Sequence, residues 1–140
     1  MKRILIMSML FVAFLAFQAC GGESNDPKAV MGDYLAASEG YIDEMEKSES
    51  ADDLARATNN FADRLESLVP RMNAMMEAHP ELKGMKGNEL PEGFEEFKDR
   101  VEALGPRMMG VMGKMMKYGN DPAVKEANER LQKVTMTMDD

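Results

Sequence analysis

Methionine is the residue whose number and spacing point most directly to chemistry in this chain. Of its 16 methionines, a group of eight lies in two short stretches, mostly at spacings that place side chains on one helix face. These eight are Met72, Met75, Met76, Met108, Met109, Met112, Met115 and Met116. Thioethers are soft ligands that select Cu(I) or Ag(I). Methionines also fill gaps in helical cores and form adaptable surfaces for apolar partners. Three roles therefore stay open: core packing, a partner surface and soft-metal binding.

The other reactive side chains do not combine into a catalytic group. The chain has one histidine, His79, and one cysteine, Cys20, so the Ser-His-Asp and Cys-His arrangements lack their parts. It has no glycine-rich phosphate loop and no cysteine cluster suited to zinc. We therefore expect a protein that is not an enzyme and that carries no cofactor.

The first residues have the composition of an export signal. A short basic start, Met1 to Arg3, precedes an apolar run from Ile4 to Phe17 that only Ser8 interrupts. The run is about 14 residues long, whereas a helix that spans a bilayer needs about 20. Its length and its basic flank are typical of a cleaved signal peptide.

The end of this run resembles the lipobox of bacterial lipoproteins. In the segment Phe17-Gln18-Ala19-Cys20-Gly21 a small residue precedes the only cysteine of the chain. The resemblance implies that the Cys20 thiol receives a diacylglycerol, that the leader is cut before Cys20, and that acyl chains such as palmitate anchor the protein in the cell envelope. Because Gly21 and not Asp follows the cysteine, the resemblance favours the outer membrane, facing the periplasm, where the source has two membranes.

Length and charge limit what the rest of the chain can be. At 140 residues there is room for one domain, and we predict a signal peptide at 1–19, a lipidated tether at 20–26 and a helical domain at 27–140. The precursor has a net charge of −8, and loss of Lys2 and Arg3 leaves 15 basic against 25 acidic side chains, a net charge of −10. This charge disfavours nucleic acid. We expect an apolar or protein partner, and the oligomeric state stays open.

The spacing of apolar residues predicts an all-α fold. Apolar residues recur every three or four positions in segments at about 27–48, 51–78 and 91–118, and in a last helix that Asp121 and Pro122 open. No segment alternates with a period of two, as a half-buried strand does. Four amphipathic helices with short connections favour an antiparallel four-helix bundle.

Two of these helices contain an internal repeat. Residues 61–72, FADRLESLVPRM, align with residues 97–108, FKDRVEALGPRM, at an offset of 36, and eight of the twelve positions are identical. We therefore expect the second and third helices to be duplicates that pack on each other, each kinked by its internal proline, Pro70 or Pro106. An antiparallel pairing with residue i opposite about 170 − i predicts two ion pairs that set the register. These pairs are Asp63 with Arg107 and Arg71 with Asp99.

Overall fold

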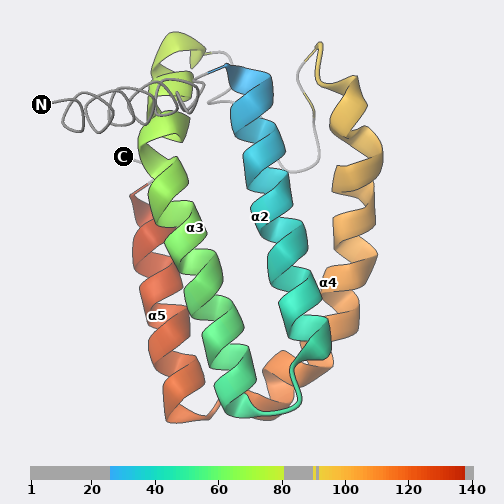
Figure 1. Ribbon diagram of the computed structural model, residues 1–140, viewed down its shortest axis with the longest axis vertical. Helices are drawn as coiled ribbons and strands as arrows, with labels where there is room; N and C mark the ends of the chain where they lie inside the picture. Colours follow the sequence, from blue (N-terminus) through green and yellow to red (C-terminus); the bar gives the residue numbers. More distant parts are fainter. Residues whose placement is uncertain (1–25, 81–89, 91, 138–140) are drawn as a thin grey trace, which may run out of the picture.

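The computed structural model of the chain describes residues 26–80, 90 and 92–137. Within these residues every regular element is helical, which confirms the all-α prediction for this part of the chain. The elements are α2 (Pro27–Lys47), α3 (Ala51–Ala78), the short 3-10 helix η2 (Glu95–Phe97), α4 (Lys98–Tyr118) and α5 (Pro122–Met136). Figure 1 shows the four α-helices side by side along the long axis. None of the helices in the described ranges is both long and apolar enough to span a bilayer.

Aspartate caps set where two of the helices begin. The Asp26 carboxylate accepts a hydrogen bond from the Ala29 amide at 3.1 Å, and the Asp121 carboxylate accepts one from the Ala123 amide at 2.9 Å. Each cap satisfies an amide that the first helical turn leaves without a partner. In both helices a proline follows the cap at the first helical position, where its missing N–H costs no hydrogen bond. The Asp-Pro pairs therefore start helices where the sequence predicts them.

Helix α4 begins later than the sequence predicts. The prediction started this helix near Pro91, which lies outside the described residues, whereas α4 begins at Lys98, directly after η2. Gly93 has a φ of 90°, a left-handed conformation that glycine adopts readily and that a right-handed helix does not contain. Phe94 and Phe97 are both buried, so their three-residue spacing reflects the burial of this turn and not a longer α-helix.

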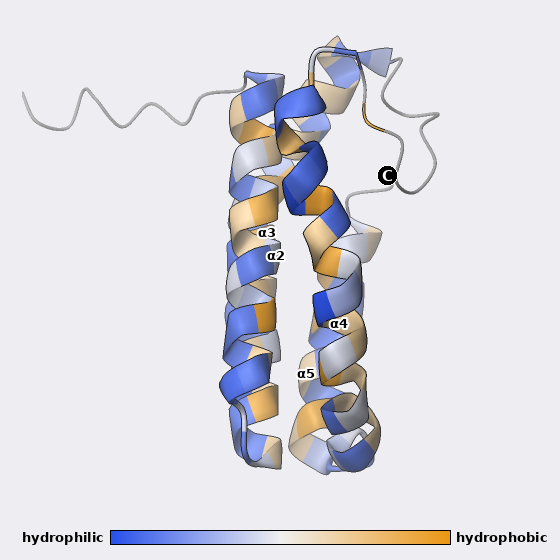
Figure 2. Ribbon diagram, turned by 90° about the vertical axis from the view of Figure 1, so that its right-hand side faces the viewer, coloured by the Kyte–Doolittle hydropathy of each residue, from blue (hydrophilic) through white to orange (hydrophobic). Residues whose placement is uncertain are grey.

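Helix α2 lies between the two helices that carry the repeat. Figure 1 shows the order α5, α3, α2 and α4 across the molecule, and Figure 2 shows α2 and α3 in one layer with α4 and α5 in the other. Arg71 of α3 pairs with Asp33 of α2 at 2.7 Å and not with the predicted Asp99. On the other side of α2, Arg100 of α4 pairs with Glu39 at 2.8 Å. Helix α4 therefore packs mainly on α2.

The two ion pairs predicted between the repeat helices are wrong, and these helices contact each other less than α4 contacts α2. Arg107 pairs with Glu46 at 2.9 Å and with Asp43, both on α2, instead of with Asp63. Asp63 pairs with Arg130 of α5 at 2.5 Å. An exposed ion pair contributes too little free energy to choose a neighbour, so complementary charges alone do not identify which helices meet. The separation of α3 from α4 by residues 79–97 leaves enough chain to reach the far side of α2.

The hydrophobic core divides along the length of the molecule. At the end with the α2–α3 and α4–α5 turns, one cluster draws residues from all four helices, among them Met45 and Val111. Away from that end, Leu35 of α2 packs with two phenylalanines that directly precede α4, and Leu65 of α3 packs separately with Val134 of α5. Figure 1 shows α4 and α5 diverging toward this second end. As a result, Val111 is the only buried residue among residues 98–118.

Candidate functional site: the methionine face of α4

The eight methionines of interest fall into two groups. Met72, Met75 and Met76 lie in the last two turns of α3, and the other five lie in the second half of α4. Figure 1 shows that the C-terminal ends of α3 and α4 are at opposite ends of the long axis. The methionines of the two helices therefore do not meet in one patch. Cys20, the predicted lipidation site, lies outside the described residues.

Five of the eight methionines contribute to packing. Met75 is 7% exposed, and Met72 and Met76 beside it are half-buried. Met108 and Met115 are also half-buried, and both pack against the core cluster that all four helices share. An unbranched thioether side chain fills such irregular spaces well. Core packing therefore accounts for Met108 and Met115, and burial withdraws most of the three α3 methionines from solvent.

The remaining three methionines face solvent. Met109, Met112 and Met116 are 74%, 52% and 73% exposed. Their spacing of three and four residues places them on one side of α4. The exposed residues around them are small or apolar, and together they form a surface that we call the methionine face of α4. It consists of Ala103, Gly105, Pro106, Met109, Gly110, Met112, Gly113 and Met116.

Three glycines leave the helix backbone open on this face. Apart from its chain neighbours and the nearby backbone of its own helix, a Cβ atom placed at Gly105, Gly110 or Gly113 would have no atom within 4 Å. Small residues let a second helix approach the backbone closely. The methionine face therefore alternates long flexible side chains with bare backbone, which is a surface suited to interlocking with another helix.

The charged side chains of this part of α4 bind α2 instead of facing outward. Arg107 and Lys114 are the only charged residues between positions 103 and 116. Arg107 binds the carboxylates of Asp43 and Glu46, and its hydrogen bonds lower the pKa of both. The Lys114 ammonium donates to the Ser48 carbonyl at 2.8 Å, at the C-terminal end of α2, where the helix dipole favours a cation. The methionine face is consequently free of charge.

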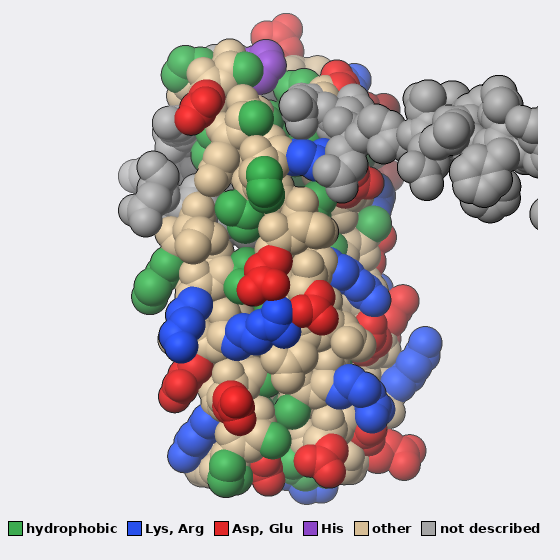
Figure 3. Space-filling model, turned by 60° about the vertical axis from the view of Figure 1, so that its left-hand side comes forward, with side chains coloured by type: hydrophobic (Ala, Val, Ile, Leu, Met, Phe, Trp, Pro, Cys, Tyr) green, Lys and Arg blue, Asp and Glu red, His purple; other side chains and the backbone are tan. Residues whose placement is uncertain are grey.

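The side of the molecule with α3 and α5 is different. Figure 3 shows Lys and Arg side chains interspersed with Asp and Glu side chains over the lower part of this side. One such group joins α5 to α3, because Arg130 pairs with Asp63 at 2.5 Å and with Glu66 at 2.9 Å. The absence of charge is therefore a property of the methionine face and not of the described surface as a whole.

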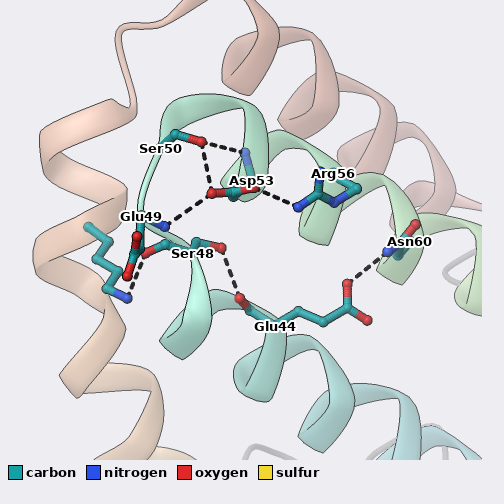
Figure 4. Close-up of polar contacts among 8 residues, drawn as sticks. Glu44, Ser48, Glu49, Ser50, Asp53, Arg56 and Asn60 are labelled. Atoms are coloured by element: carbon teal, nitrogen blue, oxygen red, sulfur yellow. Dashed lines mark hydrogen bonds and ion pairs between the residues drawn. The ribbon is translucent and has the colours of Figure 1, made fainter.

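A polar cluster at the α2–α3 turn is the second place where functional groups gather (Figure 4). Ser50 caps α3 by accepting from the Asp53 amide at 3.1 Å, and it donates to the Asp53 carboxylate at 2.9 Å. This bond is the main reason why the pKa of Asp53 is lowered, and Arg56 binds the same carboxylate at 2.6 Å. Glu44 of α2 accepts from Asn60 of α3 at 2.8 Å. A shallow cavity of about 300 Å³ lies beside these groups, and the groups themselves cap and connect the two helices.

Another shallow cavity, of about 370 Å³, lies between α2 and α3. Arg64 and Arg71 line it, and each binds a carboxylate of α2, Glu44 at 2.8 Å and Asp33 at 2.7 Å. Across the part of the chain that the structure describes, no group of three or more His, Cys, Asp or Glu side chains is placed to hold a metal ion. In that same part, every buried side-chain nitrogen or oxygen has a hydrogen-bond partner. Both arginines of the second cavity are therefore engaged in bonds that join α3 to α2.

Sequence reasoning missed the role of α2 as the acidic partner of both repeat copies. Arg64 and Arg71 of the first copy bind α2 from one side, and Arg100 and Arg107 of the second bind it from the other. The hydrogen bonds from Arg100 lower the pKa of Glu39. The signal that was available is the acidity of residues 33–46 together with arginines at the same two positions of each copy.

No protein-family model, curated protein or solved structure matches the chain, so its function is argued from its residues and geometry.

Proposed function

We propose that this protein is a lipid-anchored component of the bacterial cell envelope whose helical domain binds an apolar or protein partner. The methionine face of α4 is the observation that carries the proposal, because Met109 and Met116 are 74% and 73% exposed on an uncharged helix side. Contiguous exposed apolar surface on a soluble domain commonly marks an interaction site. Methionine suits such a site because its flexible thioether adapts to different apolar shapes.

The anchor part of the proposal is supported by the sequence of the leader. Residues 1–19 serve as the signal peptide, Cys20 carries the acyl chains, and residues 20–26 form the tether. Two or three acyl chains anchor a protein stably, whereas one does so marginally. The tether reaches at most about 3.5 Å per residue from the membrane, so it keeps the domain at residues 27–140 close to the membrane surface. With Gly21 after the cysteine, the outer membrane, facing the periplasm, is the proposed location where two membranes exist.

For the domain we propose a four-helix bundle in which successive helices are antiparallel and α3 and α4 descend from one duplicated helix. The shared residues at 61–72 and 97–108 support the duplication. Pro70 and Pro106 both lie inside continuous helices, where each removes one backbone hydrogen bond and favours a bend. The arginines of the two copies bind α2 from its two sides, which supports a common origin for their packing.

A protein or apolar partner fits the charge of the domain better than other partners do. The net charge of −10 after loss of the leader repels phosphate backbones, so nucleic acid is disfavoured. We assign no catalytic role to the domain. Soft-metal binding is the alternative that exposed thioethers allow, because Met109, Met112 and Met116 present three sulfurs on one side of one helix.

The lipid anchor is tested by the intact mass of the protein purified from its membrane. We expect a chain that begins at Cys20 and has the added mass of a diacylglycerol. A Cys20→Ala variant should keep its leader and lose the acyl chains, while the fold of the helical domain stays unchanged. A wild-type protein that retains Met1 or carries an unmodified thiol contradicts the anchor and the proposed location together.

The partner surface is tested by photo-crosslinking from the methionine face. A photoreactive amino acid at Met109 should give a crosslinked product in whole cells, whereas the same amino acid at Met136 of α5 serves as a matched control, because Met136 is a 65% exposed methionine outside this face. Equal products from both positions, or none from Met109, contradict the proposal.

Leucine substitution distinguishes between an apolar partner surface and a soft-metal site on the methionine face. A triple variant with leucine at positions 109, 112 and 116 keeps the apolar surface and removes the sulfur ligands. Partner capture should survive this change, because apolar contact does not require sulfur. Cu(I) binding that competes with a chelator and disappears in the triple variant supports the metal alternative instead.

A further inference from the structure

The methionine face of α4 has the residue spacing of a helix-packing seam. Met109 and Met116 are seven residues apart, as are Ala103 and Gly110. A seven-residue spacing keeps side chains in line along one side of a helix, and it is the repeat by which two helices pack along a common seam. Met115, one position before Met116, packs inward on the shared core. The outward seam is thus additional to the packing that holds α4 in its own domain.

The two ends of this face carry opposite charges. Glu102 precedes it and Lys117 follows it, and the positions between 103 and 116 contribute no outward charge. Glu102 lies 3.8 Å from Lys98 with both side chains 65% exposed, and Lys117 lies over the Tyr118 ring at 4.8 Å. Neither group is withdrawn from solvent, so both can meet a charge on another molecule.

We propose, building on the proposed function of this face, that its partner is a second copy of the same chain, packed with the two α4 helices antiparallel. A twofold axis between residues 109 and 110 places Glu102 of each copy opposite Lys117 of the other. The same axis places Met109 opposite Gly110 and Met116 opposite Ala103, so these two long side chains each meet a small residue, whereas Met112 lies outside this pairing. Charge complementarity and the alternation of large and small residues select the same register.

The signs of the charges disfavour the parallel arrangement of the two helices relative to the antiparallel one. Parallel packing would place Glu102 against Glu102 and Lys117 against Lys117, and like charges opposed at an interface weaken it. The distance from residue 103 to residue 117 along the helix is about 21 Å. A contact of this length lies at the small end of protein interfaces, so the dimer is reversible and forms with rising concentration or where anchored copies gather on a membrane.

The register is tested by charge exchange in the purified mature protein, followed by sedimentation velocity. Glu102→Lys and Lys117→Glu should each weaken self-association at least about fivefold, because each places like charges opposite one another. Mixing the two variants should restore dimers, since every 102–117 contact in the mixed dimer then joins opposite charges. Failure of the mixture to exceed either variant alone overturns the antiparallel register.

The surface itself is tested with substitutions on exposed side chains that leave the core untouched. Met109→Arg places two like charges next to the twofold axis and should weaken self-association at least about tenfold. Met136→Arg is the control with equal charge and similar exposure on α5, and it should leave association unchanged. Circular dichroism of all variants verifies that the helices remain folded. Equal association of wild type and Met109→Arg overturns the proposal.

Self-association and the broader proposal can fail separately. A wild-type protein that stays monomeric up to about 200 μM overturns the second-copy inference, because even weak specific interfaces show themselves in this range. If a different protein is then crosslinked from position 109 and not from position 136, the methionine face remains a partner surface with another occupant. If neither a second copy nor another protein is crosslinked from position 109, both the inference and the proposed partner surface are wrong.

Discussion

The two copies of the internal repeat share most of their residues but occupy different environments. Helix α3 has nine buried residues, whereas α4 has only Val111. Both copies bind α2 through arginines, Arg71 to Asp33 in the first and Arg107 to Glu46 in the second. Shared residues thus perform a shared task, which is attachment to α2. The difference lies on the side of each helix that faces away from α2.

The residues that differ between the copies explain why α3, but not α4, is buried on the side that faces away from α2. Ala62, Leu65 and Val69 belong to the cluster that packs α3 against α5. The second copy has Lys98, Val101 and Gly105 at the corresponding positions. A charged residue, a smaller one and a glycine cannot bury a comparable apolar area. Helix α4 therefore lacks the second packing side that α3 has, and this leaves the adjacent methionine face exposed.

Exchanging a residue between the copies should give the largest change in the free energy of unfolding. Ala62 is 0% exposed, whereas the side chain of its counterpart, Lys98, is 65% exposed. Ala62→Lys forces an ammonium into the α3–α5 contact and should lower the free energy of unfolding by at least about 4 kcal/mol. Lys98→Ala should change it by less than about 0.5 kcal/mol. Urea denaturation of both variants measures the difference, and similar losses would show that the copies are equally buried.

Truncating the leucine that the two copies share should give a smaller but still clear difference in the loss of stability. Leu68 is 6% exposed, whereas its counterpart Leu104 is half-buried. Leu68→Ala should destabilise the protein by about 3 kcal/mol, because it removes most of an apolar side chain that is almost entirely buried. Leu104→Ala should cost about 1 to 2 kcal/mol, because solvent can fill part of the space. Thermal unfolding followed by circular dichroism tests this order, and a reversed order contradicts the comparison.

Acid should loosen α4 before it loosens α3. Hydrogen bonds from Arg100 and Arg107 lower the pKa of Glu39, Asp43 and Glu46 in the folded state. Because these values are lowered, the bonds stabilise the fold above the ordinary values of 4.5 for Glu and 3.8 for Asp, and this stability is lost as pH falls through the folded values. The rate of amide hydrogen exchange in α4, corrected for the intrinsic rate at each pH, should therefore rise below about pH 4.5. Simultaneous loss of protection in α3 and α4 would contradict this order.

Substitutions of exposed residues on the methionine face should change the free energy of unfolding least. Met116 is 73% exposed, so Met116→Gln should change the free energy of unfolding by less than about 0.5 kcal/mol. The neighbouring Met115 packs on the core, and Met115→Gln should cost about 1 kcal/mol or more. Urea denaturation, at a concentration where the protein is monomeric, measures the free energy of unfolding of both variants. A large loss for Met116→Gln would mean that this side chain supports the fold of its own domain.

The helices themselves were largely predictable, because their signals are local. Asp-Pro pairs begin α2 and α5, and the predicted bounds of α3, residues 51–78, agree with Ala51–Ala78. The start of α4 was missed because Phe94 and Phe97 keep a helical spacing across the 3-10 helix η2, which follows the left-handed Gly93. Apolar spacing reports which side chains are buried, and a buried 3-10 turn has nearly the same spacing as an α-helix.

The site was predictable only in part. The sequence alone determined that methionines are concentrated in residues 108–116 and that Arg107 and Lys114 are the only charges between positions 103 and 116. Which methionines are exposed depended on where α2 lies, because α2 takes both of these charged side chains and turns Met109 and Met116 outward. Local patterns specify the faces of a helix, whereas the choice of neighbour depends on apolar contacts between residues far apart in the chain. Only the tertiary structure decided that choice.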